Sequence, residues 1–224
     1  MELSADLAWL VDHLDDLAAR TFQHIVLATI GVGVGFVISF ALAILAVRRR
    51  RTYTPILAIS DVLYTIPSLA VFAALIAVTG ISLITVEIPL VMYTLVIFVR
   101  NIAAGLDSVP PDVLEAADGL GYTNRQRLWR VEVPLSVPLI VAGLRLAAVS
   151  TIALVTVTSV LGDSFGGLGY FILEGYRRSF PFELYVGAFA SIILAFIVDW
   201  LLTRLERRIT PWARVGNASE AAAT

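Results

Sequence analysis

Long apolar runs around one polar interval are the feature that most limits what this chain can fold into. Residues 25–47 carry no charged side chain, and about 20 apolar residues are enough for a helix to cross a bilayer. Charged residues make up only 15% of the chain, against roughly 25% in soluble domains. The sequence therefore predicts an all-α integral membrane protein.

Five membrane helices are expected, at residues 25–47, 54–79, 84–103, 136–161 and 184–202. The second contains Pro67 near its middle, and proline removes a backbone hydrogen bond and kinks a helix. The uncharged core of the third, between Glu87 and Arg100, is short for a span. We therefore expect Glu87 at the outer interface and Arg100 at the inner one.

The domain organisation follows from these spans. A single transmembrane domain covers residues 21–214, and its polar interval, residues 104–135, lies outside the membrane. Residues 1–20 are acidic and lack the positive start of a secretory signal, so we expect an amphipathic extracytoplasmic segment. Residues 215–224 are expected to be a disordered cytoplasmic tail.

The arginines predict the orientation in the cell membrane, because cytoplasmic segments carry the excess of basic residues. With the N-terminus outside, twelve arginines fall inside: Arg48, Arg49, Arg50, Arg51, Arg100, Arg125, Arg127, Arg130, Arg204, Arg207, Arg208 and Arg214. Three fall outside, namely Arg20, Arg177 and Arg178. The odd number of spans then places the polar interval and the C-terminus together in the cytoplasm.

The polar interval is expected to contain two short helices. Pro110-Pro111 suits the first turn of one of them, and Gly119 and Gly121 suit its end because glycine tolerates left-handed conformations. Its small and aliphatic residues recur at helical spacing; they are Val113, Leu114, Ala116, Ala117 and Leu120. Thr123 could cap a second, basic helix. From the residues alone, a solvated loop that packs only on its own bundle is the alternative.

The same interval carries a resemblance. Glu115-Ala-Ala, three residues, Gly121, nine residues, Val131, one residue, and Val133-Pro134 together resemble the "EAA loop" of permease subunits of binding-protein-dependent ABC importers. Valines stand where that family often has Ile and Leu. The resemblance implies a type I ABC importer permease fold whose loop forms two cytoplasmic helices that dock on the ATPase. The coupling residues that it implies are Glu115, Ala116, Ala117, Gly119, Gly121, Arg130 and Pro134.

A second resemblance narrows the family. Tyr64-Thr-Ile-Pro67-Ser-Leu-Ala70 is similar to an element of osmoprotectant permeases, which move glycine betaine, choline, proline betaine and related compounds. Arg100-Asn101 and Ile209-Thr-Pro-Trp212 resemble the same branch. This implies import of osmoprotectants by alternating access, with the aromatic cage for the quaternary ammonium mainly in the binding protein. The chain departs from the family's tight Gly-x-Gly-Gly-Leu-Gly by inserting Asp163-Ser-Phe165.

Polar residues within the spans are candidates for the translocation pathway, and they are Tyr64, Thr65, Pro67, Ser68, Thr151 and Thr158. The residues alone also allow a packing kink at Pro67 and hydroxyls that only bond between helices. Arg145 should face the bundle or a dimer interface, since a charge in lipid is costly. Arg100 could tie its helix to the polar interval or extend to lipid headgroups.

The residue types exclude several kinds of chemistry. All sixteen basic residues are arginine, so the chain lacks the lysine of a P-loop. It has no cysteine and only His13 and His24, so no metal site is expected. We therefore expect a transport subunit without enzyme activity or cofactor, with ATP and Mg²⁺ on a separate ABC ATPase. The other expected partners are an extracytoplasmic substrate-binding protein and a second permease chain, identical or homologous, and no nucleic acid.

Three other functions stay open at this point. An ABC permease for another small polar solute, such as an amino acid, would carry the same loop. An ion-coupled secondary transporter often shows inverted repeats with broken helices in both halves, whereas only residues 54–79 are interrupted here. A membrane scaffold could recruit an ATPase without moving any solute.

Overall fold

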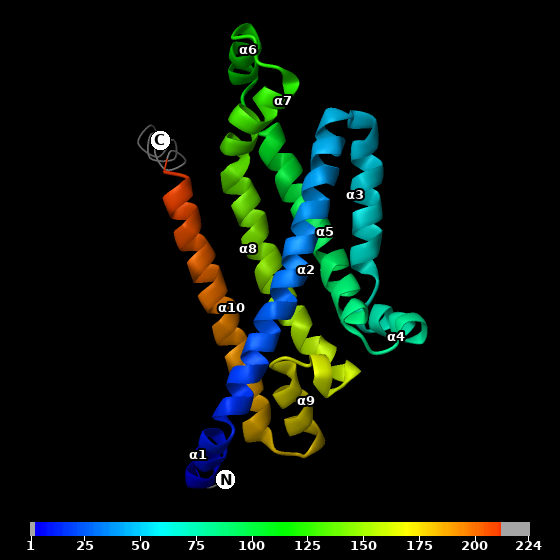
Figure 1. Ribbon diagram of the computed structural model, residues 1–224, viewed down its shortest axis with the longest axis vertical. Helices are drawn as coiled ribbons and strands as arrows, with labels where there is room; N and C mark the ends of the chain where they lie inside the picture. The colour runs from blue at the N-terminus through cyan, green and yellow to red at the C-terminus, as the bar shows by residue number, and fades with distance from the viewer. Residues whose placement is uncertain (1–2, 212–224) are drawn as a thin grey trace, which may run out of the picture.

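The computed structural model describes residues 3–211, and in this range the chain forms ten α-helices and no strand. They are α1 Leu3–Asp12, α2 Leu14–Arg48, α3 Arg50–Thr65, α4 Ser68–Thr79, α5 Leu83–Asp107, α6 Pro111–Gly119, α7 Asn124–Arg127, α8 Val133–Val157, α9 Gly169–Arg177 and α10 Pro181–Ile209. Figure 1 shows α6 and α7 at one end of the molecule and α1 and α9 at the other. The predicted tail 215–224 and the preceding residues Trp212 and Arg214 lie outside the described residues.

Four helical stretches in the described part of the chain are long and apolar enough to cross a membrane: α2, α5, Asn124–Leu161 and α10. A fifth span exists only if α3 and α4 count as one, and these helices are bent by 89°. The predicted kink is therefore a complete break. Proline disfavours helical backbone in the residue before it, and Ile66, which precedes Pro67, is extended with ψ 127°.

The chain from Asn124 to Val157 is one continuous helix, whereas the sequence predicted two. Pro134 and Pro138 both lie in α8, although a proline ring clashes with the carbonyl four residues before it. A π-helical segment, Leu128–Glu132, directly precedes α8 and widens the helix at that point. The helix predicted at residues 136–161 is therefore the later part of a longer helix that begins at Asn124, and the residue at which it enters the membrane stays a prediction.

The α1 end is more helical than predicted. α2 begins at Leu14, so the predicted domain boundary at residue 20 falls inside this helix. The loop predicted at residues 162–183 contains α9. Leu168, Phe171, Ile172 and Gly175 follow helical spacing, and all but Ile172 are buried; this pattern could have identified the helix.

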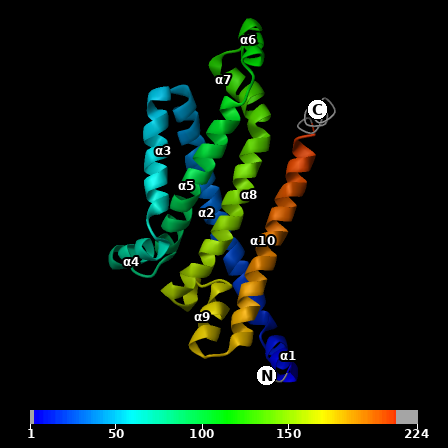
Figure 2. The ribbon, with the colours of Figure 1, turned by 180° about the vertical axis from the view of Figure 1, so that it is seen from behind.

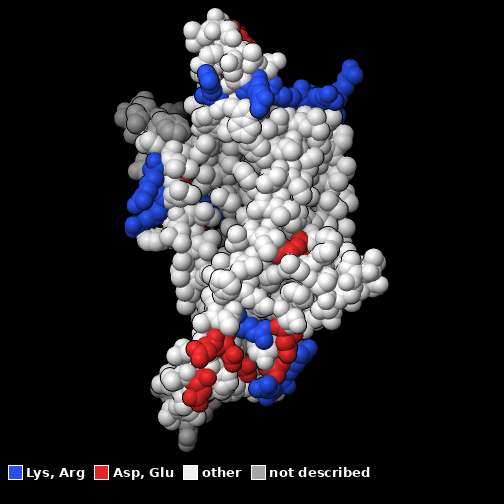
Figure 3. All heavy atoms as spheres, in the orientation of Figure 1, with Lys and Arg blue, Asp and Glu red and all other residues white. Residues whose placement is uncertain are grey.

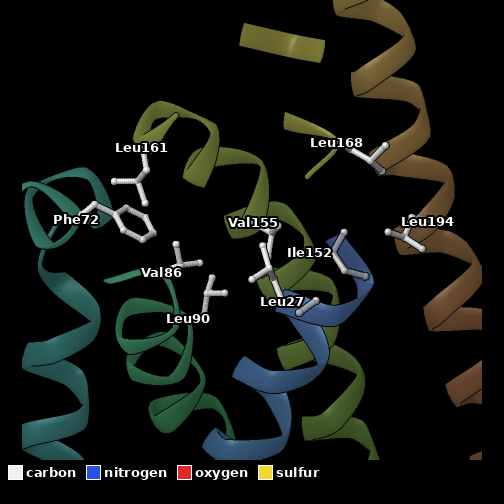
Figure 4. Packing of buried hydrophobic residues seen from close by; sticks show 10 residues of the cluster. Leu27, Phe72, Val86, Leu90, Ile152, Val155, Leu161, Leu168 and Leu194 are labelled. Atoms are coloured by element: carbon white, nitrogen blue, oxygen red, sulfur yellow. The ribbon is translucent and has the colours of Figure 1, made fainter. Parts of the chain in front are cut away.

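The centre of the bundle is formed by α5 and α8, and Figure 2 shows α8 between α5 and α10. Half of the most apolar stretch of α5 is buried (50%), but only 11% of that of α10. Figure 4 shows the core cluster at the α1 end, where Leu27, Phe72, Leu90, Val155 and Leu194 come from five different helices. α10 therefore leaves most of its apolar surface for lipid or a second chain.

Charged side chains gather at the two ends of the bundle. Figure 3 shows arginines across the α6 end and most of the visible acidic side chains at the α1 end. The broad band between them is mostly uncharged, with a few interruptions. An uncharged band of this kind is what a membrane-spanning bundle presents to hydrocarbon.

Candidate functional site

The turn after α6 depends on one of its two glycines. The Tyr122 amide donates to the Ala117 carbonyl at 3.1 Å, and the Gly121 amide donates to the Asp118 carbonyl at 2.9 Å. This pair of bonds is a Schellman motif, which needs a left-handed residue. Gly121 supplies it with φ +80°, whereas Gly119 still belongs to the helix.

Thr123 caps α7, as predicted. The Gln126 amide donates to the Thr123 hydroxyl at 3.3 Å, and the Thr123 amide donates to the Gln126 side-chain oxygen at 2.8 Å. This reciprocal pair is a capping box, which satisfies two amides that a helix start leaves free. It sets the direction of α7 immediately after the Gly121 turn.

Arg127 joins α6 to the bundle by ion pairs. Its Nη1 lies 2.5 Å from Asp118 Oδ2 on α6, and its Nε lies 3.0 Å from Glu132 Oε1 in the π-helical segment. Glu132 is buried, and Nη2 of Arg48, at the end of α2, is 3.9 Å from the same carboxylate oxygen. Arg48 also donates to the Asn124 carbonyl at 2.8 Å. A displacement of α6 would therefore pass through Arg127 to α8 and α2.

The predicted coupling residues divide into an exposed group and a packed group. The exposed ones are Glu115, Ala116, Gly119, Gly121 and Arg130. Ala117 is buried, and Pro134 is half-buried inside α8, next to the π-helical segment. An atom added at the Cβ position of Gly119 would meet nothing within 4 Å. α6 therefore presents small side chains and a carboxylate on a surface open to another protein.

A cleft of about 290 Å³ lies between α3, α5 and α8. Two predicted pathway residues, Tyr64 and Thr151, line it together with Tyr93, Thr94 and Ser150, and the other lining residues are aliphatic. Tyr93 and Thr94 were not predicted, because only the packing of α5 against α3 brings them to Tyr64. The sequence contained one signal that could have identified Tyr93. Tyrosine is enriched at the membrane interfaces, and Tyr93 lies in the middle of a predicted span.

The other predicted pathway residues do not line this cleft. Thr158 is fully buried and its hydroxyl donates to the Phe165 carbonyl at 2.6 Å, so it stabilises the turn after α8. Thr65, Pro67 and Ser68 lie at the break between α3 and α4. These three residues belong to the break that sets the direction of α4 relative to α3, and α3 carries Tyr64 into the cleft.

Arg100 pairs with Asp61 on α3 and not with the polar interval. Its Nη2 lies 2.7 Å from each carboxylate oxygen of Asp61. The hypothesis that Arg100 ties α5 to the polar interval is therefore wrong, because α5 continues past it to Asp107. Glu87 lies one turn inside α5, where it is buried and neither of its carboxylate oxygens has a hydrogen-bond partner among residues 3–211; its place at the outer interface stays a prediction.

Arg145 on α8 faces α10. Its Nε lies 2.9 Å from Asp199 Oδ1, its Nη2 lies 3.2 Å from Asp199 Oδ2, and its Nη1 lies 3.3 Å from Glu206 Oε2. These ion pairs connect α8 to the least buried span. The structure thus places Arg145 toward its own bundle.

The insertion Asp163–Phe165 is fastened to α2. The Gln23 side chain donates to the Ser164 carbonyl at 2.6 Å. Nδ1 of His24 accepts a hydrogen bond from the Leu168 amide at 3.2 Å, and its Nε2 donates to a carbonyl of α8 at 2.9 Å. Gln23 and His24 of α2 therefore hold the loop after α8 in place.

Comparison with known proteins places this geometry in a family. Residues 25–211 match the family described as "Binding-protein-dependent transport system inner membrane component". The chain is similar to the osmoprotectant import permease protein OsmW of Salmonella typhimurium, with 38% identity covering 91% of this chain and 96% of the relative. It is also similar to the carnitine transport permease protein OpuCB of Listeria monocytogenes, with 35% identity covering 88% and 90%.

A solved structure has the same fold. A chain from a crystal structure of the MetNI methionine ABC transporter in inward-facing conformations superimposes with a TM-score of 0.76, and the match covers 94% of this chain and 100% of that chain. The identity is 18%, so this similarity concerns the fold alone.

Proposed function

This chain belongs to the family of binding-protein-dependent transport system inner membrane components, and we propose that it is the permease subunit of an ATP-driven importer of osmoprotectants. The solute class is that of glycine betaine, choline and proline betaine. Relatives named for osmoprotectant and carnitine transport carry the proposal, because they match nearly the whole chain.

α6 is the proposed docking surface for a separate ATPase subunit, which would bind ATP and Mg²⁺. Its exposed Glu115, Ala116 and Gly119 support this role, and so does the Arg127 linkage to the bundle. Closure of two ATPase subunits would draw two copies of α6 together. The linkage would then rock α8 and α2 and open the pathway toward a loaded extracytoplasmic binding protein.

A second permease chain, identical or homologous, would complete the pathway. Four or five helices form too small a bundle to enclose a gated path, and α10 leaves most of its apolar surface uncovered. In the proposed arrangement solute moves between the two chains, past Tyr64 and Thr151 and the α3–α4 break.

The orientation is a proposal that cysteine labelling can test. The chain has no cysteine, so Ser164→Cys and Asp112→Cys each introduce a single thiol at an exposed position. With the N-terminus outside, a membrane-impermeant maleimide is expected to label Ser164→Cys in intact cells and Asp112→Cys only in inside-out vesicles. The reverse pattern would show that the topology is inverted.

The experiment that tests the function is uptake of labelled glycine betaine by cells that carry this chain with its ATPase and binding protein. Wild-type cells are expected to accumulate the solute. Glu115→Arg is expected to abolish uptake at unchanged membrane abundance, because Glu115 is exposed on α6 and its reversal alters the docking surface without altering the fold.

The two failures of this experiment have different meanings. No uptake by the wild type would contradict the osmoprotectant assignment and leave other small polar solutes to be tested. Normal uptake by the Glu115→Arg variant would instead contradict the role of α6 in coupling to the ATPase.

A further inference from the structure

The cleft between α3, α5 and α8 has one wall made of two aromatic rings. The ring centroids of Tyr64 and Tyr93 are 5.5 Å apart, and the ring planes are inclined by 62°. The Tyr93 hydroxyl donates to the Ile66 carbonyl. In a continuous helix the amide of Ala70 would bind this carbonyl, but that amide donates to Pro67. Tyr93 therefore binds the Ile66 carbonyl, which the helix break leaves without its helical partner, and this hydrogen bond holds the Tyr93 ring in place.

The ring of Tyr64 is accessible from the cleft. Tyr64 is 48% exposed, and it lines the cleft beside Tyr93. The two rings therefore form an angled wall that a small solute in the cleft could contact.

The rest of the cleft has no fixed charge. Ser150 and Thr151 on α8 supply hydroxyls, and none of the described lining residues is acidic or basic. Asp61, three residues before Tyr64 on α3, is paired with Arg100 at 2.7 Å. The described lining residues therefore carry no negative charge that could bind a cation by ion pairing.

A quaternary ammonium group suits such a cleft. It has no N–H to donate, so it forms no conventional hydrogen bond with hydroxyls and carbonyls, whereas the negative faces of aromatic rings attract its positive charge. A transport site must also release its solute, as the sites in ion channels do. Two aromatic rings can attract the cation, and without a free carboxylate nearby they can also release it.

We propose that Tyr64 and Tyr93 form a quaternary-ammonium contact site inside the membrane, where their ring faces select the solute during its passage. The inference rests on the proposed function and adds a second selection step after the binding protein. It also makes Tyr93, which lies opposite the helix break, a specificity-determining residue.

The test compares loss of a ring with loss of a hydroxyl in complexes reconstituted with the ATPase and binding protein. Tyr64→Leu and Tyr93→Leu are expected to lower the glycine betaine moved per ATP hydrolysed by roughly two- to thirtyfold, the range of a cation–π contact. Tyr64→Phe should stay within about twofold of the wild type, because it retains the ring. Transport by Tyr176→Leu should stay at the wild-type level, because Tyr176 is an exposed tyrosine on α9 and does not line the cleft.

A graded series separates solute contact from a packing role. Fluorinated phenylalanines at position 64 retain the shape of the ring but weaken the negative potential of its face. Transport per ATP is expected to fall stepwise with each added fluorine. This series also replaces the leucine variants if these fail to assemble.

Two results would overturn the inference while the proposed function stands: wild-type transport by both leucine variants, or a flat response to fluorination. A wild-type complex that moves no quaternary ammonium compound contradicts the proposed function itself. The inference then falls with it, and the two failures are distinguished by the wild-type measurement alone.

Discussion

Gly121→Val is expected to reduce coupled transport sharply while the protein still inserts into the membrane. Gly121 has φ +80°, where an ordinary L-residue costs roughly 1–2 kcal/mol and a β-branched one is a genuine outlier. Relief of that strain would turn α6 away from the Arg127–Asp118 ion pair, so its surface would meet the ATPase in the wrong orientation. Solute uptake in reconstituted vesicles should fall by at least about tenfold, which corresponds to roughly 1.4 kcal/mol.

Gly121→Asn is the matched control for this variant. Asparagine visits the left-handed region more readily than other residues, and a Cβ at position 121 would meet nothing within 4 Å. Any difference between the two variants therefore reports backbone conformation and not a clash. Gly121→Asn should retain most of the uptake, and normal uptake by Gly121→Val would show that the turn after α6 is not needed for coupling.

Arg145→Glu is expected to lower the amount of folded protein in the membrane more than the reversals Glu115→Arg and Arg178→Glu. Arg145 donates to Asp199 and Glu206 of α10, so the variant would place three carboxyl groups together within the spans. The side chains of Arg145 and Asp199 are 32% and 39% exposed on the surface of the bundle, and an unpaired charge that meets hydrocarbon there costs roughly 2.5–3.5 kcal/mol on insertion scales. Abundance and thermal stability of the purified protein in detergent provide the measurement.

Two further variants test this explanation. The exchange Arg145→Asp with Asp199→Arg should restore much of the abundance, because it restores the pair in the opposite sense. Arg178→Glu breaks an ion pair with Glu174 whose arginine side chain is 60% exposed, and an exposed pair contributes only about 0–1 kcal/mol. Equal losses in Arg145→Glu and Arg178→Glu would show that the position of Arg145 within the spans does not matter.

Local signals predicted the polar interval well. The Gly121 turn and the Thr123 cap each depend on hydrogen bonds between residues no more than five positions apart, so the sequence itself contains the partners. The same local reasoning did not predict that the second helix of the polar interval continues into the span of residues 136–161. A π-helical turn accommodates Pro134, and no residue type in the sequence indicates such a turn.

The partners of the charged residues could not be predicted in the same way. Arg100 and Asp61 are 39 residues apart, and Arg145 and Asp199 are 54 apart. Hydropathy shows only that each charge lies within a span and needs a partner. Which partner it finds depends on how the helices are rotated and packed, and small differences in span length change this pairing.

The sequence by itself determined the class of protein, most of the apolar spans, the short helix of the polar interval with its glycine turn, and the resemblance to ABC permeases. These properties depend on composition, on helical periodicity and on contacts within one or two turns. Only the tertiary structure decided that the helix carrying Tyr64 breaks completely, that Tyr93 lies against it, and that Thr158 is used up in a turn. Each of those facts depends on contacts between segments far apart in the chain, because the packing of helices selects one arrangement from many that the same hydrophobic pattern allows.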